Sequence, residues 1–384
     1  MATNGWAGGT ASSPGSVASC HEVKPRGVWT LPTQFVKLQA ASDSERERRA
    51  GVSMFLRVLE NEVRNARPSA QRKAEFEQSF LEVRMFNVGH GEAILLVFPG
   101  KRAWLVDGGS SNSSSDNKKL GDALVAYLEE RELSLEALVP SHPHVDHVGA
   151  VATILASGSA RIAPSLVIYR SEDTTWNLDR QWLRDLRGAI AALAGAGQVE
   201  LVLLRDQHRE VAVADGVTAH LFAGSGDGAY TSIFLQLRFR ATRLLFTGDS
   251  HCPYERELRQ LFGPEDFRAD VLKVTHHGSS SGTSRATVET VRPGIAIAST
   301  GDEPGHTLEL DTLQRLGGRP GPRAVCETLV DGDIILRTDG REYRGGVLYD
   351  VAFDTPGRFA QTLGATTIAL AAVQRSATND PQCI

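Results

Sequence analysis

The sequence predicts an α/β fold in which two β-sheets pack together and helices cover their outer faces. From residue 80 to about residue 350, short runs of β-forming residues alternate with stretches of helical periodicity. These runs fall into two successive β-rich blocks, and each block carries its own helices. A sheet that is apolar on one face must bury that face, so two such blocks favour a layered arrangement.

The expected elements follow from these local patterns, taken in chain order. Runs of β-forming residues predict strands at 81–88, 93–98, 103–106, 137–140, 165–169, 199–204, 217–222, 231–239, 244–246, 270–274, 295–299, 323–327, 333–337 and 342–348. Helical stretches predict helices at 117–130, 176–193, 254–262, 284–291 and 307–316. His208 lies among charged residues and is expected in a loop.

Composition narrows the class of protein. The chain has 384 residues, of which 41% are hydrophobic and 23% are charged, with a formal net charge of -5. This profile is typical of globular proteins and excludes collagen, coiled coils and wholesale disorder. The mild acidity does not favour a broad basic surface that wraps nucleic acid, although it leaves room for a local basic groove. No secretory signal pattern and no membrane-length apolar run is present, so we expect no membrane association and a cytoplasmic location.

The chain divides into four segments by composition. Residues 1–30 are rich in Gly, Ser, Ala and Pro, which predicts a disordered tail. Residues 31–79 form an N-terminal helical segment, in which apolar residues spaced by three and four at 42–67 predict an amphipathic helix. That helix is expected to pack on the main domain, and docking of a protein partner is the alternative. The main domain is expected at 80–355 and a C-terminal tail at 356–384.

The strongest chemical signal is the sequence SHPHVDH at residues 141–147, at the end of a predicted strand. Residues two apart in an extended loop project to the same side, so His142 and His144 can bind one cation. Asp146 and His147, one turn further on, can face a second cation. Imidazole nitrogens and carboxylate oxygens suit zinc, and also manganese or iron. The alternative is that these polar residues cap the following helix.

Three further candidate ligand positions follow strands downstream. Asp249 ends the sequence LLFTGD, where its carboxylate could bridge two cations. His276 and His277 follow the strand at 270–274. Since successive strand residues point to opposite faces, we expect one of this pair to reach the metal and the other to support it or face substrate. His306, in the loop after the next strand, could reach the same place.

The order HxHxDH, then GD, then HHGS, each at a strand end, resembles the metallo-β-lactamase fold of metal-dependent hydrolases. FNVGHGEAILL, WLVDGG and the late GH pair further resemble the soluble hydrolase domain of ComEC-type competence proteins. The ending TLVDGDIILRTDG resembles the closing hairpin of that domain. The resemblance covers about residues 80–350 and implies an αββα sandwich of two mixed sheets. No segment resembles the membrane channel of that family.

The resemblance also implies a ligand set and one departure from the general plan. The positions that match the metal-binding motifs are His142, His144, Asp146, His147, Asp249 and His277 or His276. Asp107 matches the Asp-Gly-Gly turn that lies under the metal site and orients its ligands. The general plan has another histidine before the bridging aspartate, but residues 226–232 contain none. ComEC-type relatives often carry Asn and Ser in this stretch, and this chain has Ser232 but no Asn. His208 and His220 are not favoured replacements, so the first cation is expected to be weakly bound.

The predicted chemistry rests on two divalent ions, Zn2+ or Mn2+, that share a hydroxide of lowered pKa. Asp146 could steer that hydroxide or accept its proton. His306, together with Ser279 and Ser280, could donate hydrogen bonds to the oxygens of an attacked phosphate, and the alternative for the serines is ordinary loop capping. His251 is a candidate for a supporting position beside the ligands.

The function that we expect is a dinuclear metal-dependent hydrolase that cleaves a phosphodiester, in DNA, RNA or a nucleotide, through a metal-bound hydroxide. The phosphodiester preference comes from the resemblance. Hydrolysis of a lactone, thioester or choline phosphoester is the enzymatic alternative, and a narrow apolar pocket without cationic residues would favour it. A non-catalytic metal-binding interaction module, docking through residues 42–67, is the alternative of another class.

Overall fold

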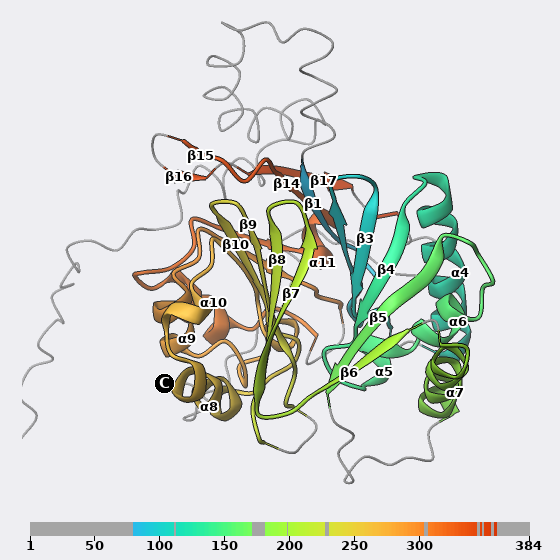
Figure 1. Ribbon diagram of the computed structural model, residues 1–384. Helices are drawn as coiled ribbons and strands as arrows, with labels where there is room; N and C mark the ends of the chain where they lie inside the picture. Colours follow the sequence, from blue (N-terminus) through green and yellow to red (C-terminus); the bar gives the residue numbers. More distant parts are fainter. Residues whose placement is uncertain are drawn as a thin grey trace, which may run out of the picture. The chain divides into compact units, whose positions relative to one another are not determined.

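The computed structural model describes residues 80–358, apart from 111–112, 171–180, 198, 227–229, 303–305, 344–345, 348 and 355–356 (Figure 1). The tail expected at 1–30, the helical segment at 31–79 and nearly all of the tail at 356–384 lie outside the described residues. Within the described ranges, no helix combines the length and apolarity that crossing a membrane requires.

The first sheet has eight strands in the order β17-β14-β1-β2-β3-β4-β5-β6. Its strands are β1 (Leu81–Met85), β2 (Ile94–Phe98), β3 (Arg102–Val106), β4 (Ser134–Val139), β5 (Ile162–Arg170), β6 (Glu200–Leu204), β14 (Asp333–Thr338) and β17 (Asp350–Asp354). Pairing is antiparallel from β17 to β3 and parallel from β3 to β6, so the sheet is mixed.

The second sheet has seven strands in the order β13-β12-β11-β10-β9-β8-β7. Its strands are β7 (Gln207–Ala214), β8 (Val217–Ala223), β9 (Phe234–Phe239), β10 (Thr242–Phe246), β11 (Val271–Lys273), β12 (Ile295–Ala298) and β13 (Ala324–Glu327). This sheet is also mixed, because β7 to β10 pair antiparallel and β10 to β13 pair parallel. A separate hairpin consists of β15 (Glu342–Tyr343) and β16 (Gly346–Val347).

Helices lie on the outer side of each sheet. Those beside the first sheet are α4 (Ser114–Glu130), α5 (Val145–Val148), α6 (Val151–Leu155) and α7 (Gln181–Gly195). Those that follow the strands of the second sheet are α8 (Cys252–Phe262), α9 (Arg285–Val291), α10 (Leu310–Gly317) and the short α11 (Thr328–Asp331), with 3-10 turns η1 (Glu265–Phe267) and η2 (His276–Gly278). Figure 1 shows α4, α6 and α7 on one side of the two sheets and α8, α9 and α10 on the other.

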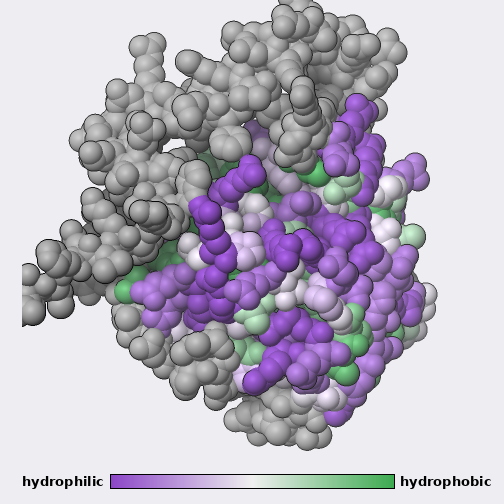
Figure 2. Space-filling model, turned by 90° about the vertical axis from the view of Figure 1, so that its left-hand side faces the viewer, coloured by the Kyte–Doolittle hydropathy of each residue, from purple (hydrophilic) through white to green (hydrophobic). Residues whose placement is uncertain are grey.

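The core is divided into layers by the two-residue period of the strands. On β2, Leu96 faces a cluster between the sheets that also contains Leu237 of β9, whereas Leu95 faces a cluster that contains Leu124 of α4. Burial of each such side chain contributes roughly 1.5–3 kcal/mol to the free energy of folding. Hydrophilic residues predominate on the face that carries α8, α9 and α10 (Figure 2), because these helices turn their apolar sides toward the second sheet. The predicted αββα sandwich of two mixed sheets is therefore confirmed.

The expected and observed elements differ at the sheet edges. His208 lies in strand β7 and not in a loop, and residues 350–354 form β17, which the sequence pattern did not indicate. Both are edge strands, which carry polar residues toward solvent and so lack a plain apolar run. On β7, Val213 packs in the core while His208 and Glu210 are exposed. The single strand expected at 342–348 is instead the β15–β16 hairpin.

Candidate metal centre

The candidate ligands follow the carboxyl ends of parallel strands. Asp107 comes directly after β3, and residues 141–147 come after β4. Asp249, residues 276–277 and His306 follow β10, β11 and β12. Because β3 and β4 are parallel, as are β10, β11 and β12, these loops meet at one edge of the sandwich. In Figure 1, α5 marks this edge at the lower end of the strands.

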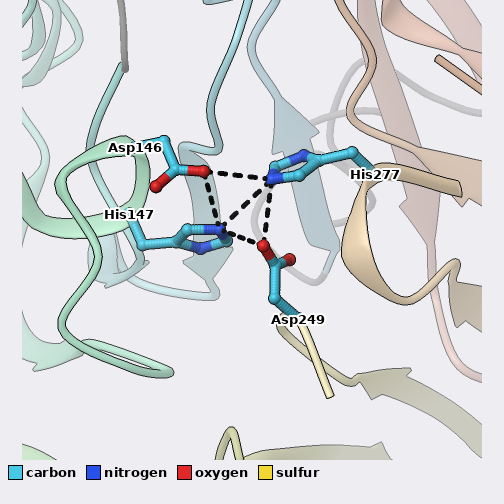
Figure 3. Close-up of side chains that lie close together, drawn as sticks. All are labelled: Asp146, His147, Asp249 and His277. Carbon is cyan, nitrogen blue, oxygen red and sulfur yellow. Dashed lines mark hydrogen bonds and ion pairs between the residues drawn. The ribbon is translucent and has the colours of Figure 1, made fainter. Parts of the chain in front are cut away.

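Four side chains converge in a central cluster, which consists of Asp146, His147, Asp249 and His277 (Figure 3). The Asp249 Oδ2 atom lies 3.0 Å from His147 Nε2 and 3.2 Å from His277 Nε2. The Asp146 Oδ2 atom lies 3.6 Å and 3.4 Å from the same two nitrogens. One ligand atom from each residue lies within 4.8 Å of all the others, which is the spacing that a single cation needs.

Hydrogen bonds fix how both imidazoles of the central cluster are oriented. His147 Nδ1 lies 2.9 Å from Asp107 Oδ2, and the other oxygen of Asp107 accepts the Ser141 backbone N–H at 2.7 Å. His277 Nδ1 lies 3.0 Å from the Ser299 carbonyl oxygen, which can only accept, so this nitrogen carries the hydrogen. The lone pair of each Nε2 atom therefore points at the carboxylates when the ring is neutral. Such outer bonds are typical of metal-binding histidines.

A second pair of histidines faces the same Asp249 oxygen. His142 Nε2 lies 3.9 Å from Asp249 Oδ2, and His276 Nε2 lies 4.0 Å from it. His144 joins this group through Nδ1, which is 2.8 Å from His142 Nε2. The expected division of roles between His276 and His277 rested on strand alternation, but both residues lie in the η2 turn with a φ of 53°. Alternation does not apply there, and both rings face Asp249.

The carboxylates and imidazoles of the site shift one another's pKa values. Burial alone would lower the pKa of His277, but Asp249 and Asp146 outweigh burial and raise that pKa to about 9. Burial would likewise raise the pKa of Asp249, but His147 and His277 hold it well below its usual range. Burial lowers the pKa of His276 to about 4, so this ring is neutral. Buried carboxylates that attract positive charge, next to neutral imidazoles, form a donor set suited to a divalent cation.

A buried ion pair lies behind the bridging aspartate, and the sequence analysis did not identify it. Lys273 is fully buried, and its Nζ atom lies 2.5 Å from Glu92 Oε2, 3.7 Å from Asp249 Oδ1 and 3.0 Å from the Gly248 carbonyl oxygen. Burial would lower the pKa of Lys273, but Glu92 and Asp249 raise it, so the ammonium is kept. A lysine inside the apolar run VLKV is the signal that could have indicated this pair, since a buried charge needs a partner.

Ser232, in the stretch that lacks the histidine of the general plan, holds the Asp249 turn. The Ser232 hydroxyl accepts the Asp249 backbone N–H at 2.9 Å. Gly248 adopts a φ of +53°, and a Cβ atom on it would lie 2.5 Å from Ser232 Oγ. Only glycine fits this close approach. His208 and His220 contact each other on β7 and β8, with 3.1 Å between Nε2 and Nδ1, and not the central cluster.

Further polar side chains line the mouth of the site. His306 Nε2 lies 3.7 Å from Asp146 Oδ2, and the side chain is 23% exposed. On the other side, His276 Nδ1 lies 3.2 Å from His251 Nε2 and 3.0 Å from Ser281 Oγ. The histidines gathered at this edge are His90, His142, His144, His147, His251, His276, His277 and His306.

The two serines expected to contact substrate have different surroundings. The Ser279 hydroxyl lies 3.2 Å from Ser281 Oγ, and its carbonyl oxygen accepts from the Thr312 hydroxyl at 3.0 Å. Ser280 is buried, and its carbonyl oxygen accepts from Arg315 at 2.8 Å. Ser281, in the same turn, contacts His276 of the site.

Comparisons with known proteins agree with this architecture. Recombination protein 2 of Haemophilus influenzae is 29% identical over 256 residues, which cover 66% of this chain and 28% of that protein. ComE operon protein 3 of Bacillus subtilis is 24% identical over 251 residues, which cover 61% of this chain and 30% of that protein. The chain therefore matches less than a third of the length of either relative.

Solved structures that match part of this chain include two RNase Z proteins. The short form of human tRNase Z is 14% identical, with a TM-score of 0.35 over 56% of this chain and 90% of that chain. The long form of RNase Z from yeast is 10% identical, with a TM-score of 0.38 over 68% of this chain and 42% of that chain. The family model of the metallo-beta-lactamase superfamily matches residues 87–302, which include all candidate ligands except His306. This chain belongs to the metallo-β-lactamase superfamily, as the order of its motifs indicated.

Proposed function

We propose that this chain is a hydrolase that uses two divalent cations, zinc or manganese, to cleave phosphodiester bonds in nucleic acids or nucleotides. The observation that carries the proposal is the position of Asp249 Oδ2, within 4.0 Å of the Nε2 atoms of four histidines. A carboxylate oxygen surrounded in this way suits a bridge between two cations. The name Recombination protein 2, borne by one relative, supports a nucleic acid as substrate.

The proposed ligands fall into two sets that share Asp249. One cation would be held by Asp146, His147, His277 and Asp249. The other would be held by His142, His144, His276 and Asp249. In the second set, His276 would take the place of the histidine that residues 226–232 lack.

The chain supplies orientation and charge around this centre. When bound, the cations supply Lewis acidity, which activates a water molecule and stabilises negative charge on an attacked phosphate. Asp146 accepts a hydrogen bond from the attacking water and so orients it. Burial would raise the pKa of Asp146, but His147 and His277 hold it well below its usual range, which favours this orienting role over proton acceptance.

His306 is the proposed hydrogen-bond donor to the substrate. Its Nε2 atom faces Asp146 Oδ2 at 3.7 Å from the solvent side of the site, and its ring lies 5.0 Å from that of His277. A donor in this position can reach a non-bridging or leaving oxygen of a phosphate held at the central cluster. Such donors lower the energy of the transition state because charge develops on those oxygens.

Metal content and turnover together test the proposed function. Metal is counted by mass spectrometry on the purified chain, and turnover is measured on bis(p-nitrophenyl) phosphate and single-stranded DNA with zinc or manganese. Asp146→Ala should lower turnover at least ~100-fold. Asp122→Ala is the matched control, because Asp122 is exposed on α4 and forms an ion pair with Lys118 on the same helix.

Three results would contradict the proposal. Bound metal with turnover of a lactone or thioester but no phosphodiester would assign a different substrate class. Bound metal without turnover of any of these substrates would indicate an interaction module. Phosphodiester turnover that Asp146→Ala leaves intact would place the activity elsewhere, or in a contaminating nuclease.

A further inference from the structure

Tyr230 brings an aromatic ring to the mouth of the site, within the stretch that lacks the expected histidine. The centroid of its ring lies 3.8 Å from that of His251, 5.2 Å from that of His276 and 5.8 Å from that of His144. Two of these neighbours belong to the proposed ligands of one cation. The ring therefore lies directly beside the metal centre and is not part of the hydrophobic core.

The position of Tyr230 is set by its own backbone and by one stacking partner. Its carbonyl oxygen accepts the His251 backbone N–H at 3.2 Å, and its ring stacks on that of His251 at an interplanar angle of 11°. Nearby, the backbone N–H of Ser232 donates to Ser250 Oγ at 3.1 Å. One face of the ring is thus covered by His251, and the chain on its C-terminal side is anchored.

Tyr230 nevertheless remains 40% exposed, which is high for a large aromatic residue. Within the described residues, the large hydrophobic side chains with comparable exposure are Leu201, Leu203, Leu261 and Phe353. None of these four takes part in the ring contacts around the central cluster. An exposed, backbone-anchored ring beside a site for phosphate chemistry is the arrangement on which nucleobases stack.

We infer that Tyr230 is a stacking platform for a nucleobase of a single-stranded nucleic acid whose phosphate lies at the central cluster. This inference rests on the proposed function and names its substrate more closely. The open face of Tyr230 receives the base, and the stacked His251 supports the ring from behind. Because every base has a π-face, such a platform favours single strands without selecting a sequence.

Binding measurements test the platform independently of turnover. Fluorescein-labelled oligothymidylate and an abasic oligonucleotide of the same length are titrated against the full chain by anisotropy, with metal added and with EDTA. A parallel titration with labelled oligouridylate compares the binding of RNA with that of DNA. The wild type should prefer the base-bearing strands, and Tyr230→Ala should weaken their binding roughly five-fold to one-hundred-fold while leaving abasic binding unchanged. Tyr230→Phe should keep the preference, since the ring is retained.

Matched variants separate stacking from a structural effect. Phe353→Ala removes an aromatic side chain that is 36% exposed on the edge strand β17, which carries none of the histidines. This variant should bind both strands as the wild type does. Metal content and thermal unfolding of Tyr230→Ala should also match those of the wild type.

The binding test of Tyr230 and the turnover test of hydrolysis can each fail without the other. A wild type without preference for base-bearing strands would overturn the platform, as would equal weakening of both strands by Tyr230→Ala. If the preference depends on Tyr230 but no phosphodiester is cleaved, the platform stands and the proposed hydrolysis fails. If phosphodiesters are cleaved and Tyr230→Ala leaves the preference intact, the hydrolysis stands and the platform fails.

Discussion

The Nε2 atoms of His147 and His277 lie 3.3 Å apart and face each other across the central cluster. The Nδ1 atom of each ring is engaged by an oxygen, from Asp107 for His147 and from the Ser299 carbonyl for His277. Two neutral rings would therefore place two lone pairs against each other and against the carboxylates. Such an arrangement calls for positive charge between the rings, which either protons or a divalent cation supplies.

Replacement of His276 should remove one cation and leave the other. We expect His276→Ala to bind about one metal ion per chain where the wild type binds about two, because His147 and His277 still hold the second cation. Inductively coupled plasma mass spectrometry after gel filtration measures this ratio. The control is His208→Ala, which removes a histidine that contacts His220 on β8. A His276→Ala variant that still binds two ions would contradict the proposed ligand set.

Replacement of His306 should affect turnover and not metal binding. We expect His306→Ala to lower kcat roughly 10²- to 10³-fold, which is the range for loss of a hydrogen-bond donor to the transition state, with metal content equal to that of the wild type. The His306 side chain is 23% exposed, and its Nε2 atom lies 3.7 Å from Asp146 Oδ2. Steady-state kinetics on bis(p-nitrophenyl) phosphate measure the effect. Loss of metal together with turnover would instead make His306 a ligand.

Removal of the Lys273 ammonium should destabilise the fold. Lys273→Met leaves the buried Glu92 carboxylate without its partner, and loss of one member of a buried ion pair costs about 3–5 kcal/mol. Adding Glu92→Gln should restore much of that stability, because the uncompensated charge is gone. Turnover should stay low in the double variant, since Asp249 Oδ1 still lacks the ammonium that lies 3.7 Å away in the wild type. The free energy of unfolding in urea and kcat are measured on the wild type, Lys273→Met, Glu92→Gln and the double variant, which together form a double-mutant cycle. A Lys273→Met variant as stable as the wild type would refute the pairing.

Glu82 should make stability depend on pH in the acidic range. Burial would raise the pKa of Glu82, but Arg131 and Arg337 hold it below the usual 4.5. A depressed folded-state pKa means that the stabilisation is complete above about pH 4.5 and is lost as the pH falls through the folded-state value. Glu82→Gln should therefore cost about 1–2 kcal/mol at neutral pH, a reduced figure because both arginines are partly exposed, and much less near pH 3.

Urea unfolding at both pH values measures this dependence. Glu265→Gln is the control, because that side chain is 79% exposed and should show little effect at either pH. An equal loss of stability in Glu82→Gln at both pH values would show that charge is not the cause.

The amino-acid sequence was enough to predict the two-sheet architecture of the main domain and the segments that carry its candidate ligands. Strand periodicity predicted most strands of the two sheets, because alternation of apolar residues is a local property. The sequence SHPHVDH, with Asp249 and the histidine pair at 276–277, likewise lies in short segments at strand ends, where spacing alone indicates metal chemistry.

Tertiary structure alone decided which atoms meet. The edge strands β7 and β17 lack an apolar run, because among the described residues each pairs with a neighbouring strand on one side only. Lys273 meets Glu92 although far from it in sequence, and Tyr230 comes beside His276 only when the loops after β8 and β11 are brought to one edge of the sandwich. Such contacts depend on the packing of distant segments and on local backbone turns such as η2. Spacing along the chain does not encode them.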